Sequence, residues 1–365
     1  TAGMSGVNAG FNVGFQTGVG VYIDGNTGIL DARIETIGSK LELHTSSTQN
    51  RADNIFVDSA NALTTLYTYD GTDDIYLRAN TDTVNIFSGD DIDFVKLGAE
   101  APDEWQQFLA DWKAADIAHS LLVNPTTPVY AATGDIQNSG DLSGILANIN
   151  IMDSGYEDSD ENVNVGAGNV LELNDDIGTT NRNYVVESDR ISLVHTIGND
   201  ERIANKPRIA YTNYDHLNIF QGSKDDRVDI VSTHSTVDTY ILGDSGNDTF
   251  NLGSTTGLIA DEINSDATLN FINSFVRIDG NAGYNLQSLT NNKAWAIATV
   301  LAAPSFNAQP TRKTTWTHTG FDILNLDDSG TVDTSNTGRI SNIQIDKFGL
   351  GKRVLYFDVD MMNVE

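Results

Sequence analysis

Turns rich in aspartate and glycine are the features of this sequence that could carry chemistry. In the clearest of them, 243–251, Gly243 and Gly246 allow a tight turn with exposed carbonyl groups, and Asp244, Asn247 and Asp248 supply side-chain oxygens. Oxygen ligands of this kind suit a hard cation such as Ca²⁺. We therefore predict a calcium site at this turn.

Two weaker acidic turns have a similar composition. One contains Asp90, Asp91 and Asp93, and the other contains Asp225 and Asp226. These five residues extend the predicted set of calcium ligands. The alternative is that Asp and Asn side chains only cap these turns through hydrogen bonds, as they do in many β proteins.

A glycan is a second candidate ligand for the first turn. Asn247-Asp248-Thr249 is the one Asn-x-Ser/Thr sequon without proline, so we predict glycosylation of Asn247, in competition with calcium. The densest run of acids, 153–161, is interpreted as a solvated linker in preference to a metal site.

Catalytic motifs are absent from the sequence. The six histidines show no metal-binding spacing, and there is neither a Gly-x-Ser-x-Gly motif nor a P-loop. We predict that the chain is not an enzyme. A β-helix polysaccharide lyase or glycoside hydrolase stays open as an alternative, because acids abound and the sequence alone cannot nominate a catalytic pair.

The turn at 243–251 resembles the nonapeptide Gly-Gly-x-Gly-x-Asp-x-U-x of RTX-like repeats, with Asp244 in place of the second glycine. More broadly, the alternation of short strands and acidic turns resembles the modules of giant secreted surface, adhesin and filament proteins. This resemblance implies structural calcium and an extracellular or cell-surface location. The full nonapeptide occurs once, whereas RTX-like β-rolls place calcium between consecutive copies.

The composition restricts the partners. With 21 basic and 51 acidic residues, the net charge of −30 disfavours nucleic acid and anionic lipid surfaces. The sequence has no cysteine, which excludes disulfides, and the best apolar stretch, 294–303, is too short to insert into a membrane. Cations, glycans and further copies of the chain are therefore the expected partners.

Internal repetition is the strongest signal of organisation. Three segments recur in the same order, at offsets that shrink from 153 to 145, which indicates duplication of one module. The later copy stops within an expected strand at Glu365, so we expect the chain to be part of something longer. The matching segments are 171–179 with 324–331, 190–192 with 339–341, and 208–219 with 353–364.

Short runs of β-branched and aromatic residues between Gly, Asp and Asn predict an all-β fold. We expect a right-handed parallel β-helix, or solenoid, with helical insertions at 102–118 and 291–303, and keep stacked antiparallel β-sandwich modules as the alternative. The predicted divisions are an early partial module (1–98), a helical and acidic-loop insertion (99–162), a complete module (163–254) and a truncated second copy (255–365).

These observations together predict a non-enzymatic structural repeat segment of an extracellular filament, surface layer or adhesive protein. We expect it to be stabilised by Ca²⁺ and to associate end to end. An adhesin stalk with a carbohydrate-binding face is the alternative binding function.

Overall fold

The computed structural model describes residues 21–24, 31–34, 40–44, 54–57, 59–69, 71, 73–90, 93–98, 140–153, 169–195, 207–253, 268–280, 321–328, 338–340, 344–346, 348–352, 354–357 and 359–364. Over these ranges the chain is all-β, with two short 3₁₀ helices, η1 (Leu142–Gly144) and η3 (Leu269–Phe271), and no α-helix. The helical insertions predicted at 102–118 and 291–303 lie outside the described residues. Among the described residues, no helix has the length and hydropathy needed to cross a bilayer.

The strands form two sheets. In order of pairing, the 12-stranded sheet contains β1 (Val21–Asp24), β2 (Asp31–Ile34), β4 (Asn54–Val57), β6 (Asp74–Leu77), β8 (Phe94–Leu97), β10 (Val170–Asn174), β14 (His216–Phe220), β16 (Asp238–Leu242), β18 (Val276–Asp279), β22 (Val354–Phe357), β21 (Gln344–Asp346) and β20 (Arg339–Ile340). The 11-stranded sheet contains β3 (Leu41–His44), β5 (Thr64–Tyr67), β7 (Val84–Gly89), β9 (Ile149–Asp153), β13 (Arg208–Thr212), β12 (Arg190–His195), β11 (Arg182–Glu187), β15 (Arg227–Ile230), β17 (Thr249–Leu252), β19 (Ile323–Leu326) and β23 (Met361–Val364).

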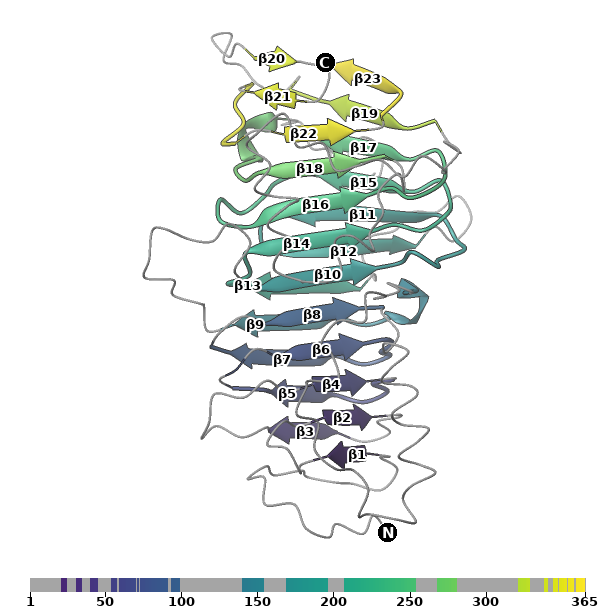
Figure 1. Ribbon diagram of the computed structural model, residues 1–365, viewed down its shortest axis with the longest axis vertical. Coiled ribbons are helices and arrows are strands. Elements are labelled where there is room, and N and C mark those ends of the chain that lie inside the picture. Colours follow the sequence, from purple (N-terminus) through teal and green to yellow (C-terminus); the bar gives the residue numbers. More distant parts are fainter. Residues whose placement is uncertain are drawn as a thin grey trace, which may run out of the picture.

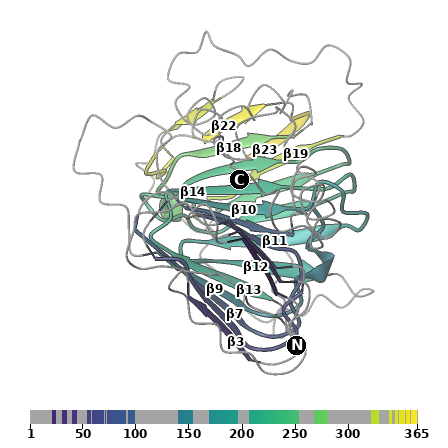
Figure 2. The ribbon, with the colours of Figure 1, turned by 60° about the horizontal axis from the view of Figure 1, so that its bottom comes forward.

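Successive strands alternate between the two sheets from β4 to β10 and again from β14 to β19. Strands that are two apart in sequence therefore lie side by side in parallel. The antiparallel pairs are β1–β2, β11–β12, β12–β13, β20–β21 and β21–β22. For the described strands, this parallel pairing makes the alternative of stacked antiparallel sandwich modules wrong. The strands stack along the long axis, with β1 and β3 toward one end and β20 and β23 at the other (Figure 1), and their direction changes gradually along that axis (Figure 2).

The core lies between the sheets because alternate residues of the central strands point inward. On β15 these are Val228 and Ile230, which pair in register with Phe250 and Leu252 of β17. All four are fully buried in one hydrophobic cluster. Burial of each such side chain contributes about 1.5–3 kcal/mol, so the stacked apolar columns supply most of the driving force.

Three consecutive strands, β11, β12 and β13, lie in the same sheet and interrupt the alternation. Bulky side chains fill the core at this level: Tyr184, Tyr211 and Tyr214 are all buried. The Tyr211 hydroxyl donates to the backbone oxygen of Glu187 at 3.1 Å, and the Tyr184 hydroxyl lies 3.4 Å from Asp175 Oδ2. Buried tyrosines need such partners for their hydroxyl groups.

The pairing pattern of the nine strands β6–β14 recurs one for one in β15–β23. We call each set a nine-strand unit. The pairs of the first unit are β6–β8, β7–β9, β8–β10, β9–β13, β10–β14, β11–β12 and β12–β13. Adding nine to every label gives the pairs of the second unit. Each strand of the second unit lies in the opposite sheet from its counterpart. The second unit thus continues the stack along the long axis, with the roles of the two sheets interchanged.

The turns after β10 and β19, which share related sequences, make matching contacts. The N–H of Leu142 donates to Asp175 Oδ1 at 2.8 Å, and the N–H of Leu269 donates to Asp328 Oδ1 at 3.1 Å. The expected equivalence of these turns therefore agrees with their contacts, although they follow strands of different sheets. The proposed match of 190–192 with 339–341 is wrong, because β12 is the central strand of its antiparallel group and β20 is an outer one. The division at 163–254 and 255–365 stays a prediction.

Candidate functional site

The predicted calcium turn connects β16 to β17, and its glycines serve the backbone. Gly246 has a φ of 140°, and a Cβ there would lie 2.3 Å from the backbone oxygen of Lys224. Asp244 also has a positive φ, 65°, a conformation that Asp and Asn adopt more readily than most residues. The glycine spacing that pointed to calcium is therefore also explained by close packing against the neighbouring turn.

Aspartates at this edge form a column across neighbouring strands. Each member directly precedes a strand of the 11-stranded sheet. Its carboxyl accepts a hydrogen bond from a backbone N–H at the start of the neighbouring strand that comes earlier in the chain. Asp226 accepts from Arg182 at 2.6 Å and Asp248 from Asp226 at 2.8 Å. Asp322 then accepts from Asp248 at 3.0 Å and Asp360 from Asp322 at 2.9 Å. We call Asp226, Asp248, Asp322 and Asp360 the aspartate column.

Burial changes the acidity of this column. The side chain of Asp248 is fully buried, and desolvation raises its pKa to about 9. The N–H of Asp226 favours the ionised form, but the neighbouring carboxyls of Asp322 and Asp226 oppose it. For Asp226 itself, burial raises the pKa to about 7. Asp248 therefore holds a proton at neutral pH unless a cation replaces it.

One oxygen of the column has no hydrogen-bond partner. Asp248 Oδ2 is buried without a donor, while Oδ1 accepts from Asp226. It lies beside Gly243, where an added Cβ would be 2.7 Å from this oxygen and 2.6 Å from the backbone oxygen of Gly280. Two oxygens thus converge on the space that a side chain at 243 would fill. Either a proton on Oδ2 or a cation would relieve their mutual repulsion.

Asp90 and Asp93 lie at the other edge of the sheets, away from Asp244 and Asp248. They follow β7 of the 11-stranded sheet, whereas Asp244 and Asp248 follow β16 of the 12-stranded sheet. Folding therefore does not bring these two pairs of predicted calcium ligands together. Asp91 lies outside the described residues.

Asp93 belongs to a second polar column, which precedes strands of the 12-stranded sheet. Its Oδ1 accepts the N–H of Asp73 at 2.9 Å, its own N–H donates to Asn169 Oδ1 at 2.8 Å, and the N–H of Asn169 donates to Asp215 Oδ2 at 2.9 Å. Burial, followed by the nearby carboxyls of Asp73 and Asp153, raises the pKa of Asp93 to about 10. Hydrogen bonds from a backbone N–H to a side-chain oxygen on the next strand thus connect neighbouring strands at both edges of the sheets.

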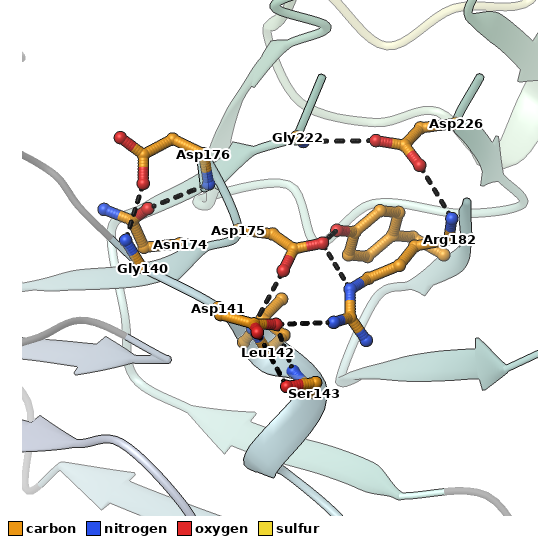
Figure 3. Close-up of polar contacts among 11 residues, drawn as sticks. Gly140, Asp141, Leu142, Ser143, Asn174, Asp175, Asp176, Arg182, Gly222 and Asp226 are labelled. Carbon is orange, nitrogen blue, oxygen red and sulfur yellow. Dashed lines mark hydrogen bonds and ion pairs between the residues drawn. The ribbon is translucent and has the colours of Figure 1, made fainter. Parts of the chain in front are cut away.

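The aspartate column begins at a buried arginine (Figure 3). Arg182, 2% exposed, donates from Nε to Asp175 Oδ2 and from Nη2 to Asp141 Oδ1, the latter at 2.8 Å. Burial raises the pKa of Asp175 to about 6 even though Arg182 opposes the shift. For Asp141, burial alone would raise the pKa, but hydrogen bonds from Ser143 and the charge of Arg182 outweigh it and lower the pKa.

The structure brings Asn247 and Asp225 together on neighbouring turns. The N–H and Nδ2 of Asn247 both donate to Asp225 Oδ1, at 2.9 and 3.0 Å, and the N–H of Phe321 donates to Asn247 Oδ1 at 2.9 Å. A glycan on Nδ2 would have to replace the contact with Asp225. Glycosylation of Asn247 stays a prediction.

Asparagines form a further column on the face of the 11-stranded sheet opposite the core. Asn363 Nδ2 donates to Asn325 Oδ1 at 2.8 Å, Asn325 Nδ2 to Asn251 Oδ1 at 2.6 Å, and Asn251 Nδ2 to Asp229 Oδ1 at 2.5 Å. Arg227 completes it with two hydrogen bonds to Asp229. We call this the asparagine column.

Sequence reasoning missed both the aspartate and the asparagine columns, although one pattern marks them. Asp-x-apolar-Asn-apolar occurs at 82–86, 215–219, 248–252, 322–326 and 360–364, and 226–230 differs only by Asp229 at the Asn position. In the last three matches and in 226–230, the Asp joins the aspartate column and the fourth residue joins the asparagine column. A search for acidic turns found the first position and ignored the periodic Asn.

Within the described residues, no three Asp, Glu or His side chains converge closely enough to hold a metal ion. A cation there would need backbone oxygens, as at Gly280. Comparisons with protein-family models, curated proteins and solved structures found no match to this chain.

Proposed function

We propose that this chain is a non-catalytic structural segment of an extracellular filament, surface layer or adhesive protein, folded as a right-handed parallel β-helix. What supports this proposal most is repetition: the same backbone-to-carboxyl contact recurs from Arg182 through Asp360, within two nine-strand units that pair alike. A catalytic centre needs groups aimed at one substrate, whereas these groups are aimed at the next strand. The right hand follows the general rule for parallel crossovers.

The polar residues support a structural role over a lyase or hydrolase. Glycosidic chemistry uses two carboxyls facing an open cleft, one of them free to take or give a proton. Here Asp226 accepts N–H groups of both Arg182 and Gly222, and Asp175 accepts from Leu142 and Arg182. Carboxyls engaged in this way hold the fold together.

Calcium belongs to the proposal as a stabilising ion. Asp248 Oδ2 and the backbone oxygen of Gly280 offer two buried oxygens, with the partly buried Asp244 on the same turn. Calcium would supply the positive charge that the column lacks in a chain of net charge −30. Binding to the folded state alone stabilises it by roughly 3 to 4 kcal/mol when free calcium exceeds Kd a hundredfold to a thousandfold.

Assembly is the function that this proposal predicts, and it is tested by sedimentation and electron microscopy of the purified 365-residue chain in millimolar calcium. We expect elongated particles whose mass increases with concentration through end-to-end contacts. Compact particles of constant mass, or turnover of an acidic polysaccharide at an enzymatic rate, would remove the support for a structural filament.

A further inference from the structure

A lysine, a glutamate and an asparagine meet on the face of the 12-stranded sheet opposite the core. Lys96 of β8 pairs in register with Glu172 of β10, and Asn174 lies two residues further along β10, on the same face. All three are buried: Lys96 is 5% exposed, Glu172 6% and Asn174 0%. Neither the aspartate column nor the asparagine column includes them.

The carboxyl of Glu172 contacts both of the other side chains. Its Oε2 lies 3.8 Å from Nζ of Lys96, and its Oε1 accepts from Nδ2 of Asn174 at 3.4 Å. Strand spacing and rise place the Cα atoms of Lys96 and Asn174 about 8 Å apart, a diagonal that the flexible stem of lysine spans. One carboxyl therefore connects an amine, which can act as a nucleophile, to an amide nitrogen, which can leave.

The amide of Asn174 is held for attack on its carbon. Its Oδ1 accepts the backbone N–H of Asp176 at 3.3 Å (Figure 3). Such a donor stabilises the negative charge that develops on the oxygen when a nucleophile adds to the carbonyl. Gly140 packs directly against this amide, because an added Cβ there would lie 2.7 Å from Cγ of Asn174.

A purely structural ion pair is the alternative role of Lys96 and Glu172. Hydrogen bonds between an ammonium and a carboxylate are about 2.7–2.9 Å long, whereas Nζ and Oε2 are 3.8 Å apart. A buried pair stabilises a fold only when its geometry is good enough to offset the desolvation of both charges. Proton transfer followed by a bond to Asn174 removes both charges from the buried face.

We propose that Lys96 and Asn174 form an intramolecular isopeptide bond, with Glu172 as the proton carrier. Nζ gives a proton to Oε2 of Glu172, and the resulting amine attacks Cγ of Asn174. The electron pair of the carbonyl bond moves to Oδ1, which faces the N–H of Asp176.

Collapse of this tetrahedral species completes the reaction. Glu172 takes a second proton from Nζ and gives one from Oε1 to Nδ2. The electron pair then returns from Oδ1, the bond between Cγ and Nδ2 breaks, and ammonia leaves. The products are the amide between Lys96 and Asn174, ammonia and protonated Glu172, so atoms and charge balance without a further reactant.

The bond would join β8 to β10 covalently across the whole segment between residues 96 and 174. The sequence has no cysteine, so this amide provides the kind of cross-link that disulfides provide in other proteins. Burial of all three side chains excludes water, which would otherwise compete with the amine. The inference requires neither the calcium nor the assembly proposed above.

Intact-mass measurement of the denatured 365-residue chain tests the bond. The parent chain should be lighter than its sequence mass by one ammonia, about 17 Da, and its digest should contain a branched peptide that joins Lys96 to Asn174. Lys96→Arg keeps a cation beside Glu172 but removes the amine, so it should have the full sequence mass. Glu172→Gln, which has no carboxyl to carry the proton, should also have the full sequence mass.

Controls separate this reaction from other losses of ammonia. Lys40→Arg changes an exposed lysine paired with Glu42, and Asn218→Ala changes the residue in register with Glu172 on β14. Both variants should keep the loss. If Lys96→Arg does not fold, the branched peptide of the parent chain decides the question.

Two results would overturn the inference. Ammonia loss that persists in Lys96→Arg would show that an asparagine cyclises onto its own backbone. A parent chain of full sequence mass would leave Lys96 and Glu172 as a buried ion pair. Neither result would affect the structural function proposed above.

Discussion

The backbone N–H of Asp226 donates to Oδ1 of Asp248 at 2.8 Å, across two adjacent parallel strands. The carboxyl of Asp248 thereby replaces the backbone hydrogen bond between adjacent strands at the position just before β15 and β17 begin. The partner oxygen of the same carboxyl, Oδ2, is buried without a donor. This pair of residues therefore provides both a contact that holds adjacent strands together and a buried oxygen that a proton or a cation must satisfy.

Replacing Asp248 tests the structural contact. Asp248→Ala removes the acceptor of the buried Asp226 N–H and should destabilise the chain by about 1–3 kcal/mol. Asp248→Asn keeps an oxygen acceptor, and its amide can donate toward Gly280, so in the absence of calcium at pH 8 it should be at least as stable as the parent. Urea unfolding measures both, and equal losses in the two variants would contradict the assigned contact.

Acid should stabilise the fold in the absence of calcium. The folded-state pKa values of Asp226, Asp248 and Asp93 are raised to about 7, 9 and 10, above the unfolded value near 4. The folded state then binds more protons, so stability decreases as pH rises from about 4 through these folded values. Melting temperatures in chelator should therefore fall from pH 5 to pH 9. A rise over this range would show that the columns are ionised in the folded state.

Loss of the buried Arg182 should destabilise the chain far more than loss of the partly exposed Arg190. Arg182→Met leaves Asp175 and Asp141 without their cation and should destabilise the chain by about 3–5 kcal/mol. Arg190→Met, which removes a partly exposed pair with Glu187, should change stability by less than about 1 kcal/mol. Chemical denaturation of both variants makes the comparison, and similar losses would mean that Arg182 is not the anchor of the column.

The asparagine column predicts an effect of a near-isosteric change. Asn325→Asp removes the donor to Asn251 and sets a carboxylate against its amide oxygen, which should destabilise the chain by about 1–3 kcal/mol. Asn61→Asp is the control, because Asn61 only accepts, from the hydroxyls of Ser59 and Thr81. Equal stability of the two variants would contradict the donor direction along the column.

The sequence predicted the strand-rich class and the repetition, because short apolar runs such as Phe250 and Leu252 alternate with polar residues in a way that only strands accommodate. It could not predict that Asp93 and Asp248 lie at opposite edges, since the sheet to which each strand belongs depends on the pairing order. For the same reason, the sequence could not predict that corresponding strands of the two nine-strand units lie in opposite sheets. Metal-site reasoning treated each Asp as a ligand, whereas the structure uses the carboxyl of Asp248 first as an acceptor for a neighbouring backbone N–H.

Calcium dependence of the melting temperature tests the central claim most directly, namely that the stacked aspartates serve structure and are stabilised by an ion. At pH 8 and equal ionic strength, millimolar calcium should raise the melting temperature of the parent chain by several degrees over excess chelator, and magnesium should do so poorly because it demands tighter octahedral geometry. Asp248→Asn should lose most of this increase. If the parent chain melts at the same temperature in chelator and in calcium, the acidic turns are hydrogen-bonded corners alone and the calcium-stabilised filament is contradicted.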